Sequence, residues 1–254
     1  MSTGTVLSQY DETPCEELQR RSGAPQLLAV DRCESTMDIA HQLAAEGAPH
    51  GTTVVAEEQG AGRGRSGKFW TSVRGAGVWV SVLLRNHAAT PSGVLSLRTG
   101  LELAQSLEAF AGAAIRLKWP NDLVLDDCKL AGILTEARWR GDLLEWIVVG
   151  IGINVRASHA EPRNAGLALH ARRADVLVAA INSALRAAEC AGELSADELS
   201  RYAARDLAIG RAVDAPVAGT VLGLTPRGGL RIATSTGVSV AVSGSLVFHS
   251  PSAE

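Results

Sequence analysis

The segment Gly-Arg-Gly-Arg-Ser-Gly at residues 62–67 follows residues 52–57, a β-branched stretch typical of a strand. A strand and this glycine spacing form a dinucleotide-binding fingerprint when a helix opens on the last glycine and an acid follows about twenty residues later. Here Phe69 and Trp70 come next, and the window contains no acid. No Gly-Lys-Ser/Thr ending makes the loop a P-loop either. The sequence therefore excludes both nucleotide-binding folds and leaves a glycine-rich loop.

This loop has the composition of an anion-binding site. Glycines let backbone amides approach an anion closely, and Arg63, Arg65 and Lys68 supply cations for phosphate or carboxylate. No acid lies between Glu58 and Glu102, while six basic residues do: Arg63, Arg65, Lys68, Arg74, Arg85 and Arg98. Two interpretations stay open, an anionic small-molecule site and a solvated basic face. The bulky residues 69–70 favour an anchored loop over a flexible linker.

The remaining pattern predicts an α+β chain. Residues 1–25 lack sustained periodicity and are expected to be a mobile leader. Strands are predicted at 26–32, 52–57 and 77–84, helices at 35–44, 92–110, 174–191 and 196–207, and a strand meander over 115–155. We expect a mixed, largely antiparallel sheet with helices on one side over residues 26–207. Short glycine-punctuated strands then predict a small SH3-like β-barrel over 208–254.

Composition narrows the class further. A net charge of −3 disfavours a general nucleic-acid binder, and about 25 residues are too few for a helix-turn-helix domain, so no DNA binding is expected. The four cysteines are scattered, which indicates neither a zinc site nor a disulfide framework. No membrane span or signal peptide is recognisable. A cytoplasmic protein without membrane association is the expectation.

Two further clusters carry lysines at strand ends. In Lys-Trp-Pro-Asn-Asp-Leu at 118–123, Pro120 favours an extended residue before it and a turn after it. In Lys-Leu-Ala-Gly-Ile-Leu-Thr-Glu at 129–136, Lys129 opens an apolar strand. Taken alone, the first is an ordinary hairpin and the second an ordinary solvated lysine. Their function can be inferred only from the other motifs that occur with them in the sequence.

Four motifs together identify a family. Gly-Arg-Gly-Arg-Ser-Gly-Lys-Phe-Trp at 62–70, the clusters at 118–123 and 129–136, and Gly-Ile-Gly-Ile-Asn-Val at 150–155 resemble the signatures of biotin–protein ligases, in that family's order and spacing. Ser35 and Thr36 upstream and the glycine-punctuated tail extend the resemblance over residues 27–249. It is closest to the monofunctional type without an N-terminal DNA-binding domain, and implies a catalytic domain like that of class II synthetases.

The resemblance implies a two-step reaction. Biotin and MgATP would form biotinyl-5′-adenylate and pyrophosphate, and the biotinyl group would pass to a lysine of a biotin carboxyl carrier domain. Lys129 would be the principal catalytic group, with Arg65 and Arg63. Biotin would be bound by Ser35, Thr36, Met37, Gln59, Arg63, Gly64, Arg65, Lys129 and Gly132. ATP would be bound by Arg63, Arg65, Lys68, Trp70, Lys118, Asn121 and Asn154, and Mg²⁺ through the ATP phosphates.

Three positions depart from the family's usual residues. Met37 stands where the family often has asparagine, Ser66 where it usually has a basic residue, and Lys68 where it usually has arginine. Because a lysine is a point charge and not a bidentate fork, the last change is expected to loosen phosphate binding without changing the reaction.

Alternatives remain at this stage. A lipoate–protein ligase or octanoyltransferase resembles the same fold but lacks the Gly-Arg loop and the cluster at 118–122. A non-catalytic protein with a decayed site predicts loss of Lys129 or Arg65, and both are present. A nicotinamide-dependent oxidoreductase is disfavoured by the missing helix and acid. The expected assembly is a monomer or a weak homodimer.

Overall fold

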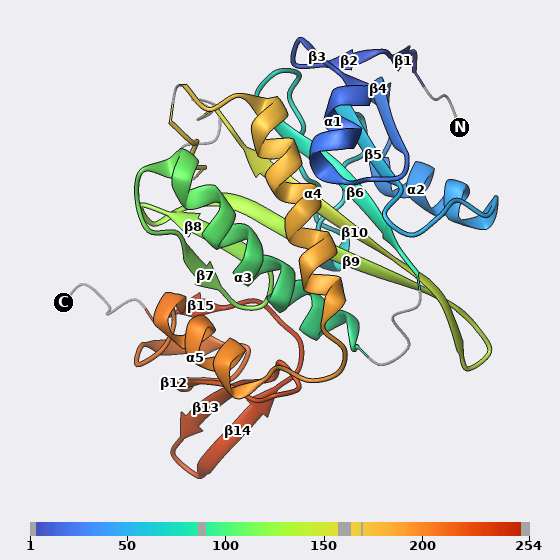
Figure 1. Cartoon of the computed structure of the whole chain (residues 1–254). Coiled ribbons are helices and arrows are strands. Elements are labelled where there is room, and N and C mark those ends of the chain that lie inside the picture. The colour runs from blue at the N-terminus through green and yellow to red at the C-terminus, as the bar shows by residue number, and fades with distance from the viewer. Residues whose placement is uncertain (1–3, 86–89, 157–163, 169, 250–254) are drawn as a thin grey trace.

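A central sheet organises the chain, whose computed structural model describes residues 4–85, 90–156, 164–168 and 170–249. One pair, β4 with β5, is parallel, and the other neighbours in this sheet are antiparallel, so the predicted mixed, largely antiparallel sheet is confirmed (Figure 1). In spatial order its strands are β1 (Val6–Leu7), β4 (Leu27–Cys33), β5 (Thr53–Gln59), β6 (Gly77–Leu84), β10 (Leu143–Asn154), β9 (Cys128–Arg140), β8 (Asp122–Leu125) and β7 (Arg116–Lys118).

Helices cover both faces of this sheet, which corrects the expectation of helices on one side. Along β6, Val80 and Val82 pack into the larger core beneath α3 and α4, whereas Leu83 packs into a second core with Ile39 of α2. Successive strand residues point to opposite faces, so a fully buried strand must be covered twice. The helices are α1 (Cys15–Ser22), α2 (Thr36–Ala45), α3 (Ser92–Ala111), α4 (Arg173–Glu189) and α5 (Ala196–Arg205).

The N-terminal segment is folded, so the expected mobile leader over residues 1–25 is wrong for residues 4–25; residues 1–3 lie outside the described part. Strand β1 pairs with β4, and β2 (Gln9–Tyr10) forms a hairpin with β3 (Thr13–Pro14). Tyr10 and Leu18 are buried, and the Tyr10 hydroxyl donates to the Gly77 carbonyl at 3.2 Å. Strands of two residues are too short to show a periodic sequence pattern, so the sequence did not predict them. Contacts with residues far along the chain hold this segment in place.

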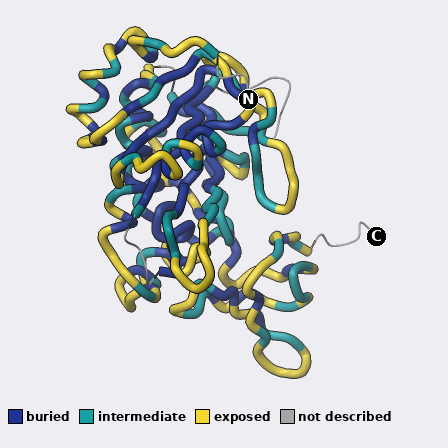
Figure 2. Tube along the Cα trace, turned by 90° about the vertical axis from the view of Figure 1, so that its right-hand side faces the viewer, coloured by how far each residue is buried: buried dark blue, intermediate teal, exposed yellow. Residues whose placement is uncertain are grey.

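A second antiparallel sheet forms the C-terminal part. Its order is β14 (Gly237–Ala241), β13 (Leu230–Thr234), β12 (Gly219–Leu224), β11 (Ala212–Ala215) and β15 (Val247–Phe248). Figure 2 shows that buried segments concentrate in the central sheet and are sparser here. The two parts touch where Trp119 Nε1 donates to the Gly228 carbonyl at 3.0 Å. The small all-β C-terminal unit agrees with the sequence, and the division at 207/208 stays a prediction.

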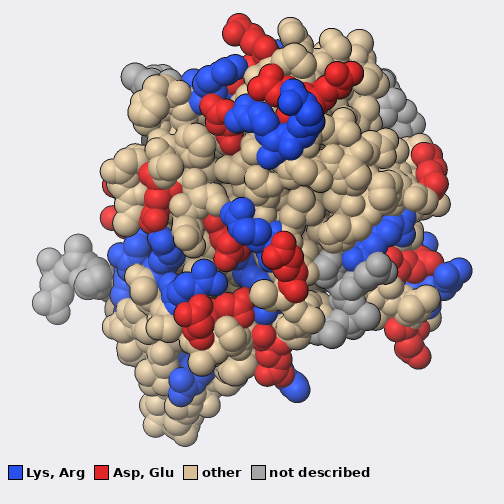
Figure 3. Space-filling view, viewed as in Figure 1, with Lys and Arg blue, Asp and Glu red and all other residues tan. Residues whose placement is uncertain are grey.

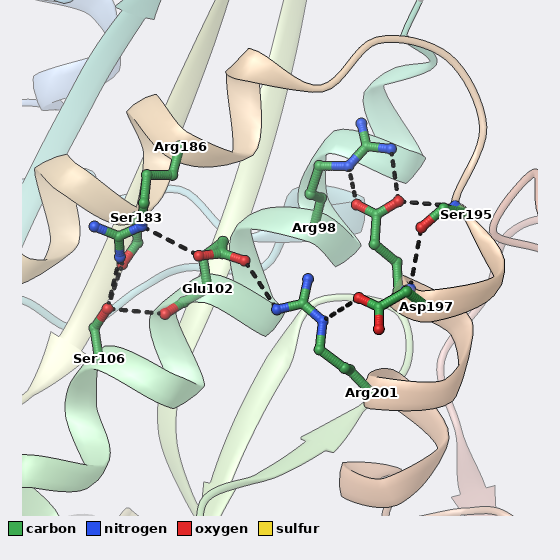
Figure 4. A network of polar contacts seen from close by, with 9 residues as sticks. Arg98, Glu102, Ser106, Ser183, Arg186, Ser195, Asp197 and Arg201 are labelled. Carbon is green, nitrogen blue, oxygen red and sulfur yellow. Dashed lines mark hydrogen bonds and ion pairs between the residues drawn. The ribbon is translucent and has the colours of Figure 1, made fainter.

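A polar network fastens α3, α4 and α5 together (Figure 4). Arg98 of α3 is 2% exposed and forms an ion pair with Glu198, which also closes the capping box of α5 with Ser195. Glu102 of α3 accepts from Arg186 of α4 and Arg201 of α5. Arg98 is thus held inside the fold and takes no part in a basic surface. This network fixes α5, after which the chain enters the C-terminal sheet.

Candidate active site

A cavity of about 150 Å³ lies where the loop after β5, the start of α2 and the middle of β9 and β10 meet. One residue of the C-terminal part, Ser245, also lines it. The lining residues include most of the predicted biotin and ATP set, namely Ser35, Thr36, Met37, Gln59, Arg63, Gly64, Arg65, Lys68, Trp70, Asn121, Lys129 and Gly132. The structure therefore brings together motifs that are far apart in the sequence.

The wall at the start of α2 is a chain of hydrogen bonds. Ser35 caps the helix by accepting from the Met37 amide at 3.3 Å. Gln59 Oε1 accepts from the Thr36 amide at 2.9 Å, and its Nε2 donates to Ser72 Oγ at 2.9 Å. Thr36 Oγ1 lies 2.8 Å from Ser81 Oγ. Ser72 and Ser81 do not line the cavity, but they hydrogen-bond to Gln59 and Thr36, which do; no sequence motif pointed to them.

The glycine-rich loop is a small hairpin, and no helix opens on its last glycine. The Gly64 amide donates to the Lys68 carbonyl at 2.7 Å, and the Trp70 amide to the Gly62 carbonyl at 2.8 Å. The short 3₁₀ turn η1 (Arg65–Gly67) forms its tip. A Cβ on Gly62 would lie 2.5 Å from the Trp70 carbonyl oxygen, so glycine is required there. This geometry agrees with the exclusion of a dinucleotide-binding fingerprint.

Lys129 lies on the cavity wall beside a carboxylate. Its Nζ is 2.8 Å from Asp122 Oδ1 and 5.0 Å from the centre of the Trp70 ring. A Cβ added to Gly132 would be 2.8 Å from Trp70 Cζ3, and one added to Gly152 would be 2.4 Å from Trp70 Cε2. The two glycines thus make room for the Trp70 indole. Asp122 was not predicted, and it is the one carboxylate among the described residues that line the cavity.

The two arginines of the loop have different surroundings. Arg65 Nη1 donates to the Gly244 carbonyl at 3.2 Å, and burial lowers the pKa of Arg65, with Asp122 acting in the opposite sense. Arg63 is ion-paired with Asp38 at 2.5 Å and with Glu136 at 3.2 Å. Arg65 therefore lies in the cavity wall as a cation bound to a carbonyl, whereas Arg63 is bound by two carboxylates.

The structure does not place every predicted ATP residue in the cavity. Lys118 and Asn154 are absent from the described lining. Lys118 Nζ lies 5.4 Å from the centre of the Phe248 ring, and burial lowers the pKa of Lys118, helped by the charges of Lys129, Lys68 and Arg211 and opposed by Asp122. Asn154 Nδ2 donates to the Lys129 carbonyl at 3.2 Å, so its amide holds the backbone of the catalytic candidate.

The basic residues in the acid-free stretch after Glu58 have two roles: some line the cavity, and others stabilise the fold. Arg63, Arg65 and Lys68 line the cavity, but Arg85 donates to the Ala48 carbonyl near the end of α2, and Arg98 is buried in the helix network. The face seen in Figure 3 carries basic and acidic side chains side by side. A continuous solvated basic face is therefore not what these residues form.

Two negative findings concern the described residues alone. Within those ranges, no group of three or more His, Cys, Asp or Glu side chains is placed to hold a metal ion. In the same part of the chain, no helix is both long enough and apolar enough to cross a membrane.

Known proteins share the sequence and the fold. Residues 29–154 match the model of the biotin/lipoate A/B protein ligase family. The chain is 42% identical over 132 residues to the bifunctional ligase/repressor BirA of Bacillus spizizenii, covering 51% of this chain and 40% of that protein. It is 38% identical over 146 residues to the biotin–[acetyl-CoA-carboxylase] ligase of Mycobacterium tuberculosis, covering 55% of this chain and 53% of that protein. The matches thus span about half or less of these relatives.

A solved structure extends the likeness to nearly the whole chain. The biotin protein ligase from Aquifex aeolicus in complex with biotin and ATP superposes with a TM-score of 0.73 and 26% identity, covering 89% of this chain and 99% of that one. The family match includes the Gly-Arg loop, Lys129 and the glycines of β10. Over residues 29–154 the chain therefore belongs to the biotin/lipoate A/B protein ligase family.

Proposed function

We propose that the chain is an ATP-dependent biotin–protein ligase. In the first step, a biotin carboxylate oxygen attacks the α-phosphorus of ATP, the new C–O–P linkage forms, and the bond to pyrophosphate breaks. In the second, a lysine amine of the acceptor attacks the acyl carbon, AMP leaves, and the amine loses a proton. The observation that carries the proposal is that Lys129, Arg65 and Trp70, from three separate motifs, line one cavity.

Lys129 is the group best suited to the first step. Negative charge grows on the oxygens between the attacking carboxylate and phosphorus, and a fixed ammonium stabilises it. The ion pair with Asp122 restrains the lysine, and Asn154 holds the Lys129 carbonyl. Arg65 and Lys68 add positive charge for the carboxylate and phosphates. Because the reaction needs placement and charge, no side chain has to become a covalent nucleophile.

The walls also suit the two ends of the substrates. Thr36 and Gln59 in the lining offer partners to a buried ureido group, which would otherwise lose its hydrogen bonds to water, and Ser81 and Ser72 hold these two side chains in place. The Trp70 indole has a buried Nε1 without a hydrogen-bond partner among the described residues, and its ring lies against Gly152. To stack on a planar group such as adenine, the Trp70 ring has to turn away from Gly152. We place biotin on the first wall and assign adenine to Trp70.

Magnesium fits this site only together with the nucleotide. Mg²⁺ in such enzymes is held by one or two carboxylates plus substrate phosphates and water, and it would offset phosphate charge. Asp122 is the carboxylate within the described lining. That donor set suits an ion carried by ATP and does not suit a cage built from protein ligands.

The acceptor is proposed to be a biotin carboxyl carrier domain of a carboxylase, in keeping with the names of the relatives. We further propose a cytoplasmic enzyme that acts as a monomer or weak homodimer and binds neither DNA nor membranes. Salt-sensitive, sequence-specific retention of DNA by the purified chain would overturn the DNA part of this proposal.

ATP–pyrophosphate exchange tests the first step directly. Biotin should drive incorporation of labelled pyrophosphate into ATP, and lipoate at the same concentration should not. Exchange driven by lipoate and not by biotin would move the chain to the lipoate branch of the family. Replacing Arg65 with alanine should lower biotin-dependent exchange by at least about 100-fold, since one fixed charge-stabilising donor contributes that much.

A further inference from the structure

Arg63 is engaged on the outer rim of the cavity by two acidic side chains. Its Nη1 donates to Asp38 Oδ1 of α2 at 2.5 Å, and its Nη2 donates to Glu136 Oε2 of β9 at 3.2 Å. The remaining nitrogen, Nε, is buried and has no hydrogen-bond partner among the described residues. A guanidinium has five N–H donors on three nitrogens, and here one donor of each outer nitrogen binds a carboxylate. The two carboxylates thus hold the guanidinium toward α2 and β9 and not toward a substrate anion.

The charges lead to the same conclusion. One cation between Asp38 and Glu136 does not attract an anion, because its positive charge is already offset. The hydrogen bonds and charges of these carboxylates raise the pKa of Arg63 against the effect of burial. Arg65 and Lys68 have no ion pair with a carboxylate within 4.0 Å among the described residues. The loop thus contains one neutralised cation and two that remain available to substrate.

We propose that Asp38 and Glu136 are positioning residues that anchor the Gly-Arg loop over the cavity through Arg63, and that substrate anions are met by Arg65, Lys68 and Lys129. The role follows from where the carboxylates lie: one on α2 and the other on β9, so Arg63 ties the loop to two of the elements that line the cavity. This reverses the expectation that Arg63 contacts biotin and ATP.

Glu136 is held in place by a hydrogen bond from His41, which is itself bonded to Trp146. Trp146 Nε1 donates to His41 Nδ1 at 2.9 Å, which leaves His41 Nε2 to donate to Glu136 Oε2 at 3.1 Å. The hydrogen bond from His41 and the charge of Arg63 hold the pKa of Glu136 below its usual value, against the effect of burial. The carboxylate therefore stays charged and fixed in direction, which is what an anchor for Arg63 requires.

A second attachment holds the other side of the loop. Arg65 donates to the Gly244 carbonyl, which follows β14 of the C-terminal sheet. Between the two attachments, the Gly64–Lys68 and Trp70–Gly62 hydrogen bonds keep the loop in one piece. A lid fastened on two sides excludes water from the cavity, and a mixed anhydride held beneath it is protected from hydrolysis. This consequence rests on the proposed ligase function, whereas the anchoring does not.

Two substitutions weaken the anchor while preserving side-chain shape. Asp38→Asn and Glu136→Gln each remove one of the two negative charges that pair with Arg63, whereas Asp38→Glu keeps the negative charge. The control is Asp197→Asn, which breaks the Asp197–Arg201 ion pair of α5, where Asp197 is 79% exposed. Hydrogen exchange of the amides of residues 60–70 reports anchoring without any substrate. The biotin KM and the kcat of pyrophosphate exchange report its effect on function.

Each anchor variant should speed amide exchange in the loop by about fivefold, as expected for loss of one partly exposed ion pair. The biotin KM should rise by a similar factor with kcat changed less than about twofold. Asp38→Glu and Asp197→Asn should behave like the parent chain. Unchanged loop exchange in both anchor variants would overturn the proposal, as would a fall in kcat at constant KM. If the parent chain shows no biotin-dependent exchange, the ligase function fails, and the hydrogen-exchange result still decides the anchoring.

Discussion

Replacing Lys129 with alanine removes the ammonium from a position where its structural contribution is small. The Lys129 and Asp122 side chains are 37% and 25% exposed. An ion pair open to water to that extent contributes about 0.2–1 kcal/mol to folding, and an exposed contact with an aromatic face about 0.5–1 kcal/mol. For a chain of this size, the loss lowers the Tm by less than about 6 °C. The variant should therefore remain folded at assay temperature.

The effect on the reaction is expected to be much larger. A fixed donor aimed at developing charge is worth about 2.7–4 kcal/mol in the transition state, which corresponds to a loss of roughly 10²–10³ in rate. Biotin-dependent pyrophosphate exchange measures the rate, and thermal unfolding of the same preparation measures stability. Arg227→Ala is the matched control, since it breaks an ion pair with Glu193 in which Arg227 is 83% exposed and which is not part of the cavity lining.

Two results would refute this reasoning about Lys129. Exchange at the parent rate would show that its ammonium does not stabilise the reaction. Loss of exchange together with unfolding below the assay temperature would show that the Lys129–Asp122 pair holds the fold, contrary to its exposure. Arg227→Ala should leave both the exchange rate and the Tm unchanged.

Three further predictions concern packing and pH. Gly152→Ala should cost about 1–3 kcal/mol in denaturant unfolding of the ligand-free chain, because the new methyl group overlaps the Trp70 ring; parent-like stability would contradict the packing. Leu18→Ala should cost about 2–5 kcal/mol in denaturant unfolding, since Leu18 is 0% exposed, whereas no change would restore a mobile leader. The hydrogen bond from Arg205 holds the pKa of Glu108 below 4.5, so the stability it contributes is present above 4.5 and lost as the pH falls below it; Glu108→Gln should flatten that part of an unfolding-versus-pH curve.

The sequence predicted elements whose own residues favour one secondary structure. Residues 77–84 form a buried strand of β-branched and apolar residues, and the predicted bounds are those of β6. The glycine-rich loop and Lys129 were predicted because their motifs are local. Asp38 and Glu136 were not, since they lie 25 and 73 residues from Arg63, and an acid on a helix or strand has no local sign of such a partner. Ser72 and Ser81 were missed for the same reason.

Arg63 and Arg65 show where a motif stops being informative. They are the same residue type, two positions apart in one loop, and the resemblance to known ligases assigns both to substrate. In the fold, one side chain reaches the acids on the α2 and β9 rim and the other a carbonyl beside the C-terminal sheet. The charge of Arg63 is already matched by two carboxylates and adds little attraction for phosphate. Phosphate binding by the loop therefore depends more strongly on Arg65 and on the lysine at position 68. Lys68→Arg should then tighten ATP binding, measured as a lower ATP KM.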